Sequence, residues 1–219
     1  MVSHGERMSR ILASYDDWIV RGYCWGRFKI LRQRFLLEIG QYMPEVGSVL
    51  DVGCGFGLFA LYFSLEKPGL RLEGIDLDER RIELARRAAR RLGLEAARFD
   101  VARAEQLRLG ERRFDGIYTL DLIHHLPRAA VRPLLEAFHA AIAPGGRLVV
   151  KDVDTRPAYK RLFTHALDLA MDPARPPHYW PSAELAALLR EVGFRVYHHT
   201  MNDYLPYPHM LYVCEKLPV

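Results

Sequence analysis

The sequence has few cysteines and no long apolar run. Its three cysteines, Cys24, Cys54 and Cys214, lie far apart, and none belongs to a Cys-x-x-Cys pair. This spacing favours neither a zinc site nor a disulfide framework, so a cytoplasmic, reducing setting is expected. The longest uninterrupted apolar stretch, residues 58–63, is far shorter than the roughly 20 residues that cross a bilayer. Residues 1–10 are polar and do not resemble a signal peptide.

The remaining composition is that of a globular domain. Half of the 219 residues are hydrophobic and 26% are charged, which is enough apolar material for a sizeable core. The net charge is +4, and a basic excess raises the question of an acidic partner. Nearly all basic residues are arginine, and those in residues 79–92 are interpreted as the solvated face of a helix. This interpretation argues against a nucleic-acid partner.

Apolar residues at helical spacing predict two helices ahead of the core, residues 11–20 and 28–42. Gly22 and Gly26 predict a break between them. We therefore expect a helical N-terminal cap at residues 1–44.

Strands and helices alternate from residue 46 onward. The expected strands cover residues 46–52, 71–75, 96–99, 114–120, 147–151, 194–199 and 210–215. The expected helices cover residues 58–65 and 79–92, a segment ending at 142 with Pro133 in its first turn, and 183–191. Asp78 is a good N-cap for the second helix. This alternation predicts an α/β fold, a doubly wound, seven-stranded, mostly parallel sheet with an antiparallel C-terminal hairpin, at residues 45–219.

A second cap element is expected in an insertion at about residues 153–181. Residues 156–171 carry an apolar stripe at helical spacing, which suits a lid, a homodimer contact or a membrane surface. Aromatic residues are frequent in this insertion, in the N-terminal cap and near the last hairpin. They are Tyr15, Trp18, Tyr23, Trp25, Phe28, Tyr159, Phe163, Tyr179, Trp180, Tyr204, Tyr207 and Tyr212. Together they suit an apolar pocket for a planar small molecule.

The most informative stretch follows the first expected strand. Residues 49–57 read Val-Leu-Asp-Val-Gly-Cys-Gly-Phe-Gly, a strand that runs into glycines at alternate positions. Glycine lets a backbone approach a ligand closely, and open α/β sheets bind ligands at the carboxyl ends of strands. A dinucleotide motif would need glycine at position 58, which is Leu58, and no Gly-Lys-Ser/Thr occurs. Asp51 suits a cationic ligand such as S-adenosylmethionine better than a pyrophosphate.

With these residues the sequence resembles the class I S-adenosylmethionine-dependent methyltransferases, over roughly residues 45–217. Gly53, Gly55 and Gly57 match the glycine loop of that family. Asp76, at the end of the second strand, matches the acidic residue that accepts hydrogen bonds from both ribose hydroxyls. The resemblance implies a Rossmann-like fold with S-adenosyl-L-methionine as cofactor and S-adenosyl-L-homocysteine as product.

Further landmarks follow along the chain at the spacing of the family. Leu77 matches a residue that packs on the adenine face, and Asp100 matches an acidic side chain near the adenine amino group. The stretch after the fourth strand resembles the loop beside the methionine moiety. The cofactor-binding residues that the resemblance implies are Asp51, Gly53, Cys54, Gly55, Gly57, Asp76, Leu77, Asp100, Val101, Leu120 and Asp121.

Methyl transfer needs alignment of donor and acceptor, and an oxygen or carbon acceptor also benefits from a general base. His124 and His125 are the candidates, because the pKa of histidine lies near operating pH. A metal site at Asp121, Asp152 and Asp154 is the weaker alternative, because the Asp-Asn pair of metal-dependent relatives reads Asp-Val here. We expect no metal, and expect Asp152 and Asp154 to orient substrate, cap a helix or pair with arginine.

The sequence thus predicts a methyltransferase that acts on oxygen or carbon of a small aromatic, quinone-like, polyketide or lipid-like acceptor. An RNA methyltransferase is one alternative, because phosphate contacts require only the arginines. A subunit that binds the cofactor without catalysis is the other. Acceptor identity and oligomeric state, including a homodimer, stay open.

Overall fold

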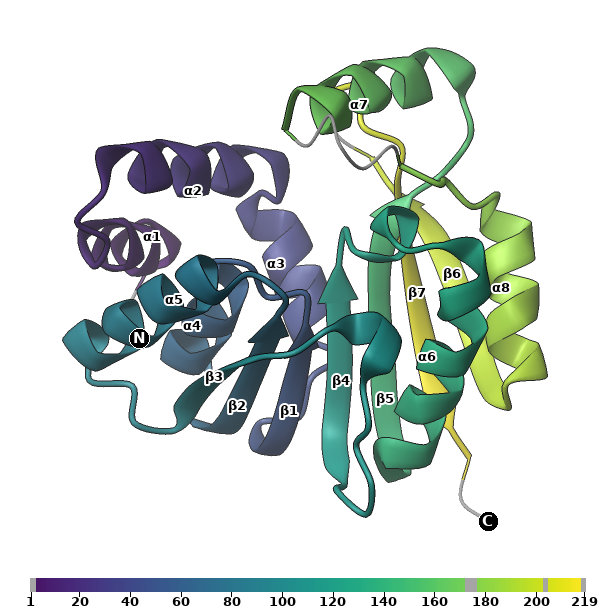
Figure 1. The fold of residues 1–219 in the computed structure, drawn as a ribbon, viewed down its shortest axis with the longest axis horizontal. Helices are drawn as coiled ribbons and strands as arrows, with labels where there is room; N and C mark the ends of the chain where they lie inside the picture. The colour runs from purple at the N-terminus through teal and green to yellow at the C-terminus, as the bar shows by residue number, and fades with distance from the viewer. Residues whose placement is uncertain (1–2, 172–176, 203–204, 218–219) are drawn as a thin grey trace. The chain divides into compact units, whose positions relative to one another are not determined.

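The computed structural model describes residues 3–171, 177–202 and 205–217 (Figure 1). The chain divides into two compact units, Met1–Ala104 and Glu105–Val219. Together the units supply the seven strands of a mixed, mostly parallel sheet, so the α/β fold predicted from the sequence is confirmed. None of the helices in the described residues is both long and apolar enough to cross a bilayer.

The first unit begins with three helices and continues as a βαβαβ segment. Its elements are α1 (His4–Ala13), α2 (Trp18–Ile30), α3 (Gln33–Gly40), β1 (Val46–Val52), α4 (Leu58–Glu66), β2 (Gly69–Asp76), α5 (Glu79–Leu92) and β3 (Ala97–Val101). The strands pair in the order β3-β2-β1, and both pairs are parallel. Helix α4 is apolar on all sides and is buried from Leu58 to Ser64, as expected of a helix in the core.

The predicted break at the two cap glycines is wrong. Gly22 and Gly26 lie inside α2, and the chain turns before α2 and again between α2 and α3. The Asp17 side chain begins α2 by accepting hydrogen bonds from the amides of Ile19 and Val20. A glycine costs only about 1 kcal/mol inside a helix, less than burial of an apolar stripe contributes. That stripe consists of Val20, Cys24 and Phe28.

The second unit follows a short 3-10 helix, η1 (Ala104–Gln106), at the boundary. Its elements are β4 (Phe114–Leu120), η2 (Ile123–His125), α6 (Arg128–Ala141), β5 (Ile142–Val153), α7 (Ala158–Met171), α8 (Ser182–Glu191), β6 (Phe194–Met201) and β7 (His209–Lys216). The strands pair in the order β4-β5-β7-β6. Strands β4 and β5 are parallel, while β7 is antiparallel to both β5 and β6. The predicted antiparallel C-terminal hairpin is confirmed. Its second strand, β7, lies between β5 and β6, so β6 is the edge strand.

Two expectations in this unit need correction. Pro133 lies in the interior of α6 and not in its first turn, because α6 begins at Arg128. Strand β5 begins at Ile142, five residues before the predicted start. Its pairing shifts register between Phe114 and Gly116 of β4, so residues 143–146 form an irregular extension of the strand. Residues 172–176 and 203–204, which include part of the expected insertion and Tyr204, lie outside the described residues.

Candidate active site

In the first unit, the glycine loop joins the end of β1 to α4. Gly53, Gly55 and Gly57 all have positive φ, of 81°, 56° and 75°. Side chains with a Cβ adopt this left-handed region only at a cost, so alternate glycines are what this turn requires. The sequence signal and the backbone therefore agree residue by residue.

The backbone amides of this loop are largely used within the protein. The amides of Gly53 and Cys54 both donate to the carbonyl of Ile75, at 2.8 and 2.9 Å. The Gly55 amide donates to Oδ2 of Asp76 at 2.9 Å. Phosphate-binding loops instead point successive amides at their ligand. This loop is therefore shaped for a ligand other than a phosphate.

Two of the nearby glycines are needed for packing, and a third faces open space. A Cβ on Gly57 would lie 2.8 Å from both the Ala85 Cβ and the Phe99 ring. A Cβ on Gly74 would lie 2.6 Å from that ring. A Cβ on Gly55 would have nothing within 4 Å. Gly55 is therefore the point where a ligand can approach the loop backbone.

Asp76, at the end of β2, is placed to hold both the loop and a ligand. Its Oδ2 accepts from Gly55, and its Oδ1 accepts from the Asp78 amide at 3.0 Å. A carboxylate can accept about four hydrogen bonds, so the half-buried group keeps capacity for ligand hydroxyls. Beside it, Leu77 and Val101 are 37% and 47% exposed, which leaves apolar surface for a planar group. These features fit the adenosine part of S-adenosylmethionine.

The other acidic residues predicted for the cofactor differ in their surroundings. Asp51 is 3% exposed at the end of β1. With burial as the main cause, Asp51 and Asp76 also help to raise the pKa of the Cys54 thiol, which stays protonated. Asp100 is exposed at the end of β3, and its Oδ1 accepts from Arg86 at 3.0 Å. Its contact with adenine stays a prediction.

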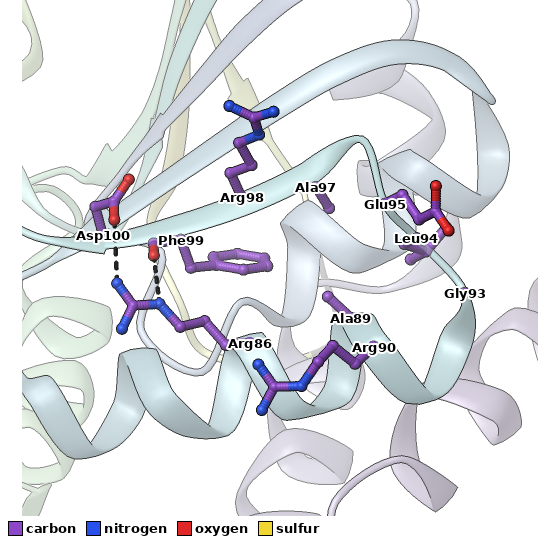
Figure 2. Close-up of a pocket in the computed structure, with 10 residues that line it drawn as sticks. All are labelled: Arg86, Ala89, Arg90, Gly93, Leu94, Glu95, Ala97, Arg98, Phe99 and Asp100. Carbon is purple, nitrogen blue, oxygen red and sulfur yellow. Dashed lines mark hydrogen bonds and ion pairs between the residues drawn. The ribbon is translucent and has the colours of Figure 1, made fainter.

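A groove of about 580 Å³ runs between α5 and β3. Figure 2 shows Arg86 in it, with Nε donating to the Phe99 carbonyl at 2.7 Å and a terminal nitrogen reaching Asp100. Arg90 and Arg98 also line the groove. The charged residues of the lining are three arginines and two acids, and the lining includes no glycine of the β1–α4 loop. This groove is therefore not the aromatic acceptor pocket that the sequence predicts.

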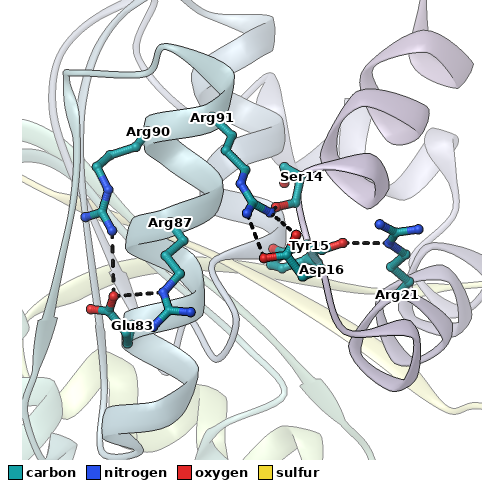
Figure 3. A network of polar contacts seen from close by, with 8 residues as sticks. All are labelled: Ser14, Tyr15, Asp16, Arg21, Glu83, Arg87, Arg90 and Arg91. Atoms are coloured by element: carbon teal, nitrogen blue, oxygen red, sulfur yellow. Dashed lines mark hydrogen bonds and ion pairs between the residues drawn. The ribbon is translucent and has the colours of Figure 1, made fainter.

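The helical cap is attached to the glycine loop through Tyr15, which follows α1. The Tyr15 hydroxyl donates to the carbonyl of Phe56 at 2.8 Å, and the Tyr15 carbonyl accepts from Arg21 at 2.6 Å. On α5, Arg91 holds the same turn through Asp16 and the Ser14 carbonyl (Figure 3). The interpretation of the arginine-rich helix as a solvated face therefore covers only part of its role.

In the second unit, a buried acid–histidine pair follows β4 and β5. Nδ1 of His124 is hydrogen-bonded to Oδ1 of Asp152, and the His124 amide donates to Oδ2 at 3.3 Å. His124 is 2% exposed and Asp152 is 3% exposed. A carboxylate at Nδ1 fixes the ring orientation and favours the lone pair on Nε2. This is the arrangement that makes histidine a base.

A partly buried ion pair also follows β4. Asp121, directly after β4, has a φ of 60° and forms an ion pair with Lys151 of β5. Lys151 is 1% exposed, and its carbonyl accepts from the Asp121 amide at 2.8 Å. Leu120, also predicted for the cofactor, is buried at the end of β4. The contact of Asp121 with a cofactor stays a prediction.

Histidine and aromatic rings surround His124. The half-buried His125 ring lies 4.1 Å from that of His124, between centroids, and the Tyr179 ring stacks on His124 at 5.5 Å. The His178 amide donates to the His124 carbonyl at 2.6 Å. His165 of α7 contacts Tyr179 edge-on. The segment before α8 thus covers the histidine pair.

The remaining acid of this region has a structural contact. Oδ1 of Asp154 accepts from the Ser182 amide at 3.0 Å, at the first residue of α8. This is the helix-capping role that the sequence suggested among its alternatives. Across the described residues, no group of three or more histidine, cysteine or acidic side chains could hold a metal ion.

Sequence reasoning missed three of these contacts. Lys151 lies in the strand expected at residues 147–151, and a lysine inside a buried strand is itself a signal of a charged partner. The stacking of Tyr179 on His124 and the bond from Tyr15 to the glycine loop join residues far apart in the sequence. No local pattern reveals such pairs.

The profile of the family described as "Methyltransferase domain" matches residues 26–199. The chain belongs to this family. Among relatives of this methyltransferase domain, the S-adenosyl-L-methionine-dependent Diels-Alderase iccD of Talaromyces variabilis is 31% identical over 52% of the chain and 39% of its own length. A ubiquinone biosynthesis O-methyltransferase of Neisseria meningitidis serogroup C is 29% identical over 89% of the chain and 83% of its length. The chain spans about two fifths of the length of the first curated relatives it matches.

Solved structures share the fold of this methyltransferase domain. An O-methyltransferase family protein from Burkholderia thailandensis has a TM-score of 0.74 at 15% identity, with 99% of this chain and 63% of that chain covered. An S-adenosylmethionine-dependent methyltransferase from Methanosarcina mazei has a TM-score of 0.68 at 22% identity, with 83% and 98% covered. The 4+2 cyclase SpnF has a TM-score of 0.71 at 16% identity, with 85% and 81% covered.

Proposed function

We propose that this protein is an S-adenosyl-L-methionine-dependent methyltransferase with a small-molecule acceptor. The bound cofactor supplies an activated methyl group on a sulfonium. Asp76 and the Gly55 backbone hold the ribose side, and Leu77 and Val101 contact adenine. Family membership supports this, as do the open space at Gly55 and the carboxylate that orders it. Asp51, Gly53, Cys54, Gly57, Asp100, Leu120 and Asp121 complete the proposed cofactor site.

The buried pair of His124 and Asp152 carries the proposed chemistry. We infer that Nε2 of His124 accepts the proton of the acceptor as the methyl group arrives, while Asp152 stabilises the charged ring. His125 borders this ring and contributes to acceptor contacts. The acceptor that benefits from such a base is a hydroxyl or an acidic carbon, because an amine acceptor is already nucleophilic when neutral.

The acceptor class follows from the surrounding rings. Aromatic side chains of α7 and of the segment before α8 suit a small aromatic, quinone-like, polyketide or lipid-like molecule. Relatives named as ubiquinone biosynthesis O-methyltransferases support an oxygen acceptor. Residues 1–44 and 153–181 serve as caps on a cofactor-binding domain at 45–219. The three free thiols suit a cytoplasmic setting, and a homodimer stays a prediction.

The test is a substitution of His124 with glutamine, measured with labelled S-adenosyl-L-methionine and a series of catechols whose phenol pKa values differ. His124→Gln should lower kcat about 100-fold or more, with cofactor affinity unchanged. Activity should return as pH rises through the pKa of each catechol, because the phenol is then already ionised and needs no base. Asp152→Asn should show the same pattern in weaker form.

The matched control is His198→Gln, because His198 is an exposed histidine of β6 that stacks on Tyr212. It should keep wild-type kcat. If His124→Gln lowers kcat equally for catechols of every phenol pKa, and also lowers the unfolding temperature, then the pair of His124 and Asp152 has a structural role. Transfer of label to RNA and not to any catechol would favour the RNA methyltransferase.

A second candidate reaction is cycloaddition without methyl transfer. The likeness to iccD and SpnF favours it, because iccD is a Diels-Alderase and SpnF, which shares the fold, is a 4+2 cyclase. A cycloaddition removes no proton and would not need the pair of His124 and Asp152. Formation of S-adenosyl-L-homocysteine with any acceptor supports methyl transfer. Binding of the cofactor without turnover across the whole series supports the cyclase or the non-catalytic subunit.

A further inference from the structure

Helix α2 presents two tryptophans to solvent. Trp18 is 78% exposed and Trp25 is 51% exposed, although tryptophan is usually well buried in folded proteins. Ile19, beside Trp18, is 61% exposed, and Leu37 on α3 is 48% exposed. We call Trp18, Ile19, Trp25 and Leu37, with the basic residues among them, the α2–α3 surface.

The two tryptophans share one side of α2. Trp18, Gly22, Trp25 and Lys29 follow one another at helical spacing of four, three and four residues. A Cβ on Gly22 would have nothing within 4 Å, so the helix surface between the two indoles is open. The opposite side of α2 is buried and keeps the helix in place. Core packing therefore does not account for the tryptophans.

The segment that carries these exposed side chains is basic. Residues 18–37 contain five basic residues and no aspartate or glutamate. Lys29 lies with its ammonium 5.1 Å from the centre of the Trp25 ring, next to the exposed apolar side chains. Four of the basic residues, Arg21, Lys29, Arg32 and Arg34, are exposed, whereas Arg27 faces the protein with its guanidinium over the Phe59 ring. Exposed indole and aliphatic side chains within a purely basic segment are the composition of a helix that lies in a membrane interface.

We propose that the α2–α3 surface attaches the protein to an anionic lipid bilayer. The tryptophans enter the headgroup region, and the basic side chains contact lipid phosphates. Helix α2 has 13 residues, too few to span a bilayer, so the attachment is peripheral. This inference does not rest on methyl transfer, and it holds for a protein with either candidate reaction.

Charge and apolar exposure together distinguish an anionic bilayer from the other partners that this surface could bind. A second copy docked symmetrically on the same surface would place two sets of four exposed basic residues against each other. A nucleic acid would satisfy the charge, but it would leave Ile19 and Leu37 without an apolar contact. An anionic bilayer satisfies both the charge and the apolar side chains. The lipid surface is therefore the partner that the residues favour.

The experiment uses the full chain with Trp180→Phe, so that Trp18 and Trp25 alone report by fluorescence. Vesicles of phosphatidylcholine alone are compared with vesicles that also contain phosphatidylglycerol. We expect sedimentation with the anionic vesicles only, together with a blue shift of emission, and loss of both at high salt. Absence of sedimentation with the anionic vesicles would overturn the proposal.

Two sets of variants locate the surface. The double variant Trp18→Ser, Trp25→Ser should no longer sediment with anionic vesicles. The double variant Lys29→Gln, Arg34→Gln should also lose binding. It keeps the tryptophans, so it tests the surface even if the first variant folds poorly. Matched controls are Tyr197→Ser, an exposed aromatic residue of β6, and Arg108→Gln with Arg195→Gln. Equal binding by variants and controls would contradict the assignment. So would binding of an RNA oligonucleotide in place of vesicles, or a blue shift on self-association without lipid.

Discussion

Arg91 of α5 and Asp16, in the turn between α1 and α2, are joined by two hydrogen bonds of 2.7 and 2.6 Å, one from each terminal nitrogen (Figure 3). The same guanidinium donates to the Ser14 carbonyl at 2.9 Å. Tyr15 lies between Ser14 and Asp16, and its hydroxyl donates to the glycine loop. The ion pair therefore holds in place the turn that contacts this loop. Arg91 is therefore a positioning residue.

Arg91→Gln should weaken binding of S-adenosyl-L-methionine by less than about tenfold, because exposed ion pairs contribute little by themselves. The turn at residues 14–17 should become more sensitive to protease, because it loses three hydrogen bonds. Calorimetric titration and limited proteolysis measure the two effects. Arg90→Gln is the control, since Arg90 pairs only weakly with Glu83 on its own helix. Equal behaviour of the two variants would argue against a positioning role.

Gly55→Ala and Gly57→Ala should separate ligand binding from folding. Gly57→Ala should lower the free energy of unfolding by about 2–4 kcal/mol, because the added methyl group meets Ala85 and Phe99 in a left-handed backbone. Gly55→Ala should cost only about 1–2 kcal/mol, from its backbone alone, and yet reduce cofactor affinity. Urea unfolding and calorimetric titration give the comparison. If both variants lose only stability, Gly55 does not face the ligand.

Asp76→Asn should weaken S-adenosyl-L-methionine binding by about 1–3 kcal/mol, because a charged acceptor of the ribose hydroxyls is replaced by a neutral one. Asp100→Asn should weaken it less, because that carboxylate is exposed and bonded to Arg86. Titration of both variants with S-adenosyl-L-homocysteine measures the difference. The reverse order of effects would place the main cofactor contact at β3 and not at β2.

Local signals explain the elements that the sequence predicts well. Helix α5 has its predicted bounds because Asp78 caps it, accepting from the Arg81 amide, and Gly93 ends it in the left-handed region. Strands β1 and β4 also have their predicted bounds, because each is a short apolar run with polar or glycine residues at its ends. The signal in each case lies within the element itself.

The elements that were misplaced depend on contacts from elsewhere. Gly22 and Gly26 stay helical because α2 buries its opposite face, which composition alone does not indicate. The pairing of His124 with Asp152 joins residues 28 positions apart, through two neighbouring strands. The sequence placed both residues at strand ends but could not tell histidine from arginine as the partner of Asp152. The exposure of Trp18 likewise depends on which side of α2 the core covers.

The three thiols are buried, and this couples folding to alkaline pH. Burial raises the pKa of the Cys24 thiol to about 12 and raises those of Cys54 and Cys214 well above the ordinary range. In the unfolded chain the same thiols titrate near pH 8.5. Above that pH the unfolded state therefore binds fewer protons than the folded state, and the free energy of unfolding falls as pH rises.

The contribution of the thiols to stability should accordingly be constant below about pH 8 and decline between about pH 9 and 12, with each thiol contributing up to about 1.4 kcal/mol per pH unit. Tyrosines and lysines also titrate in this range, so the informative quantity is a difference. Cys214→Ala should lower stability at neutral pH but flatten the alkaline slope by the share of one thiol, as measured by urea unfolding at a series of pH values. Curves for the two proteins that run parallel from pH 8 to 11 would mean that the Cys214 thiol ionises equally in both states, because only a group with different folded and unfolded pKa values can change the slope.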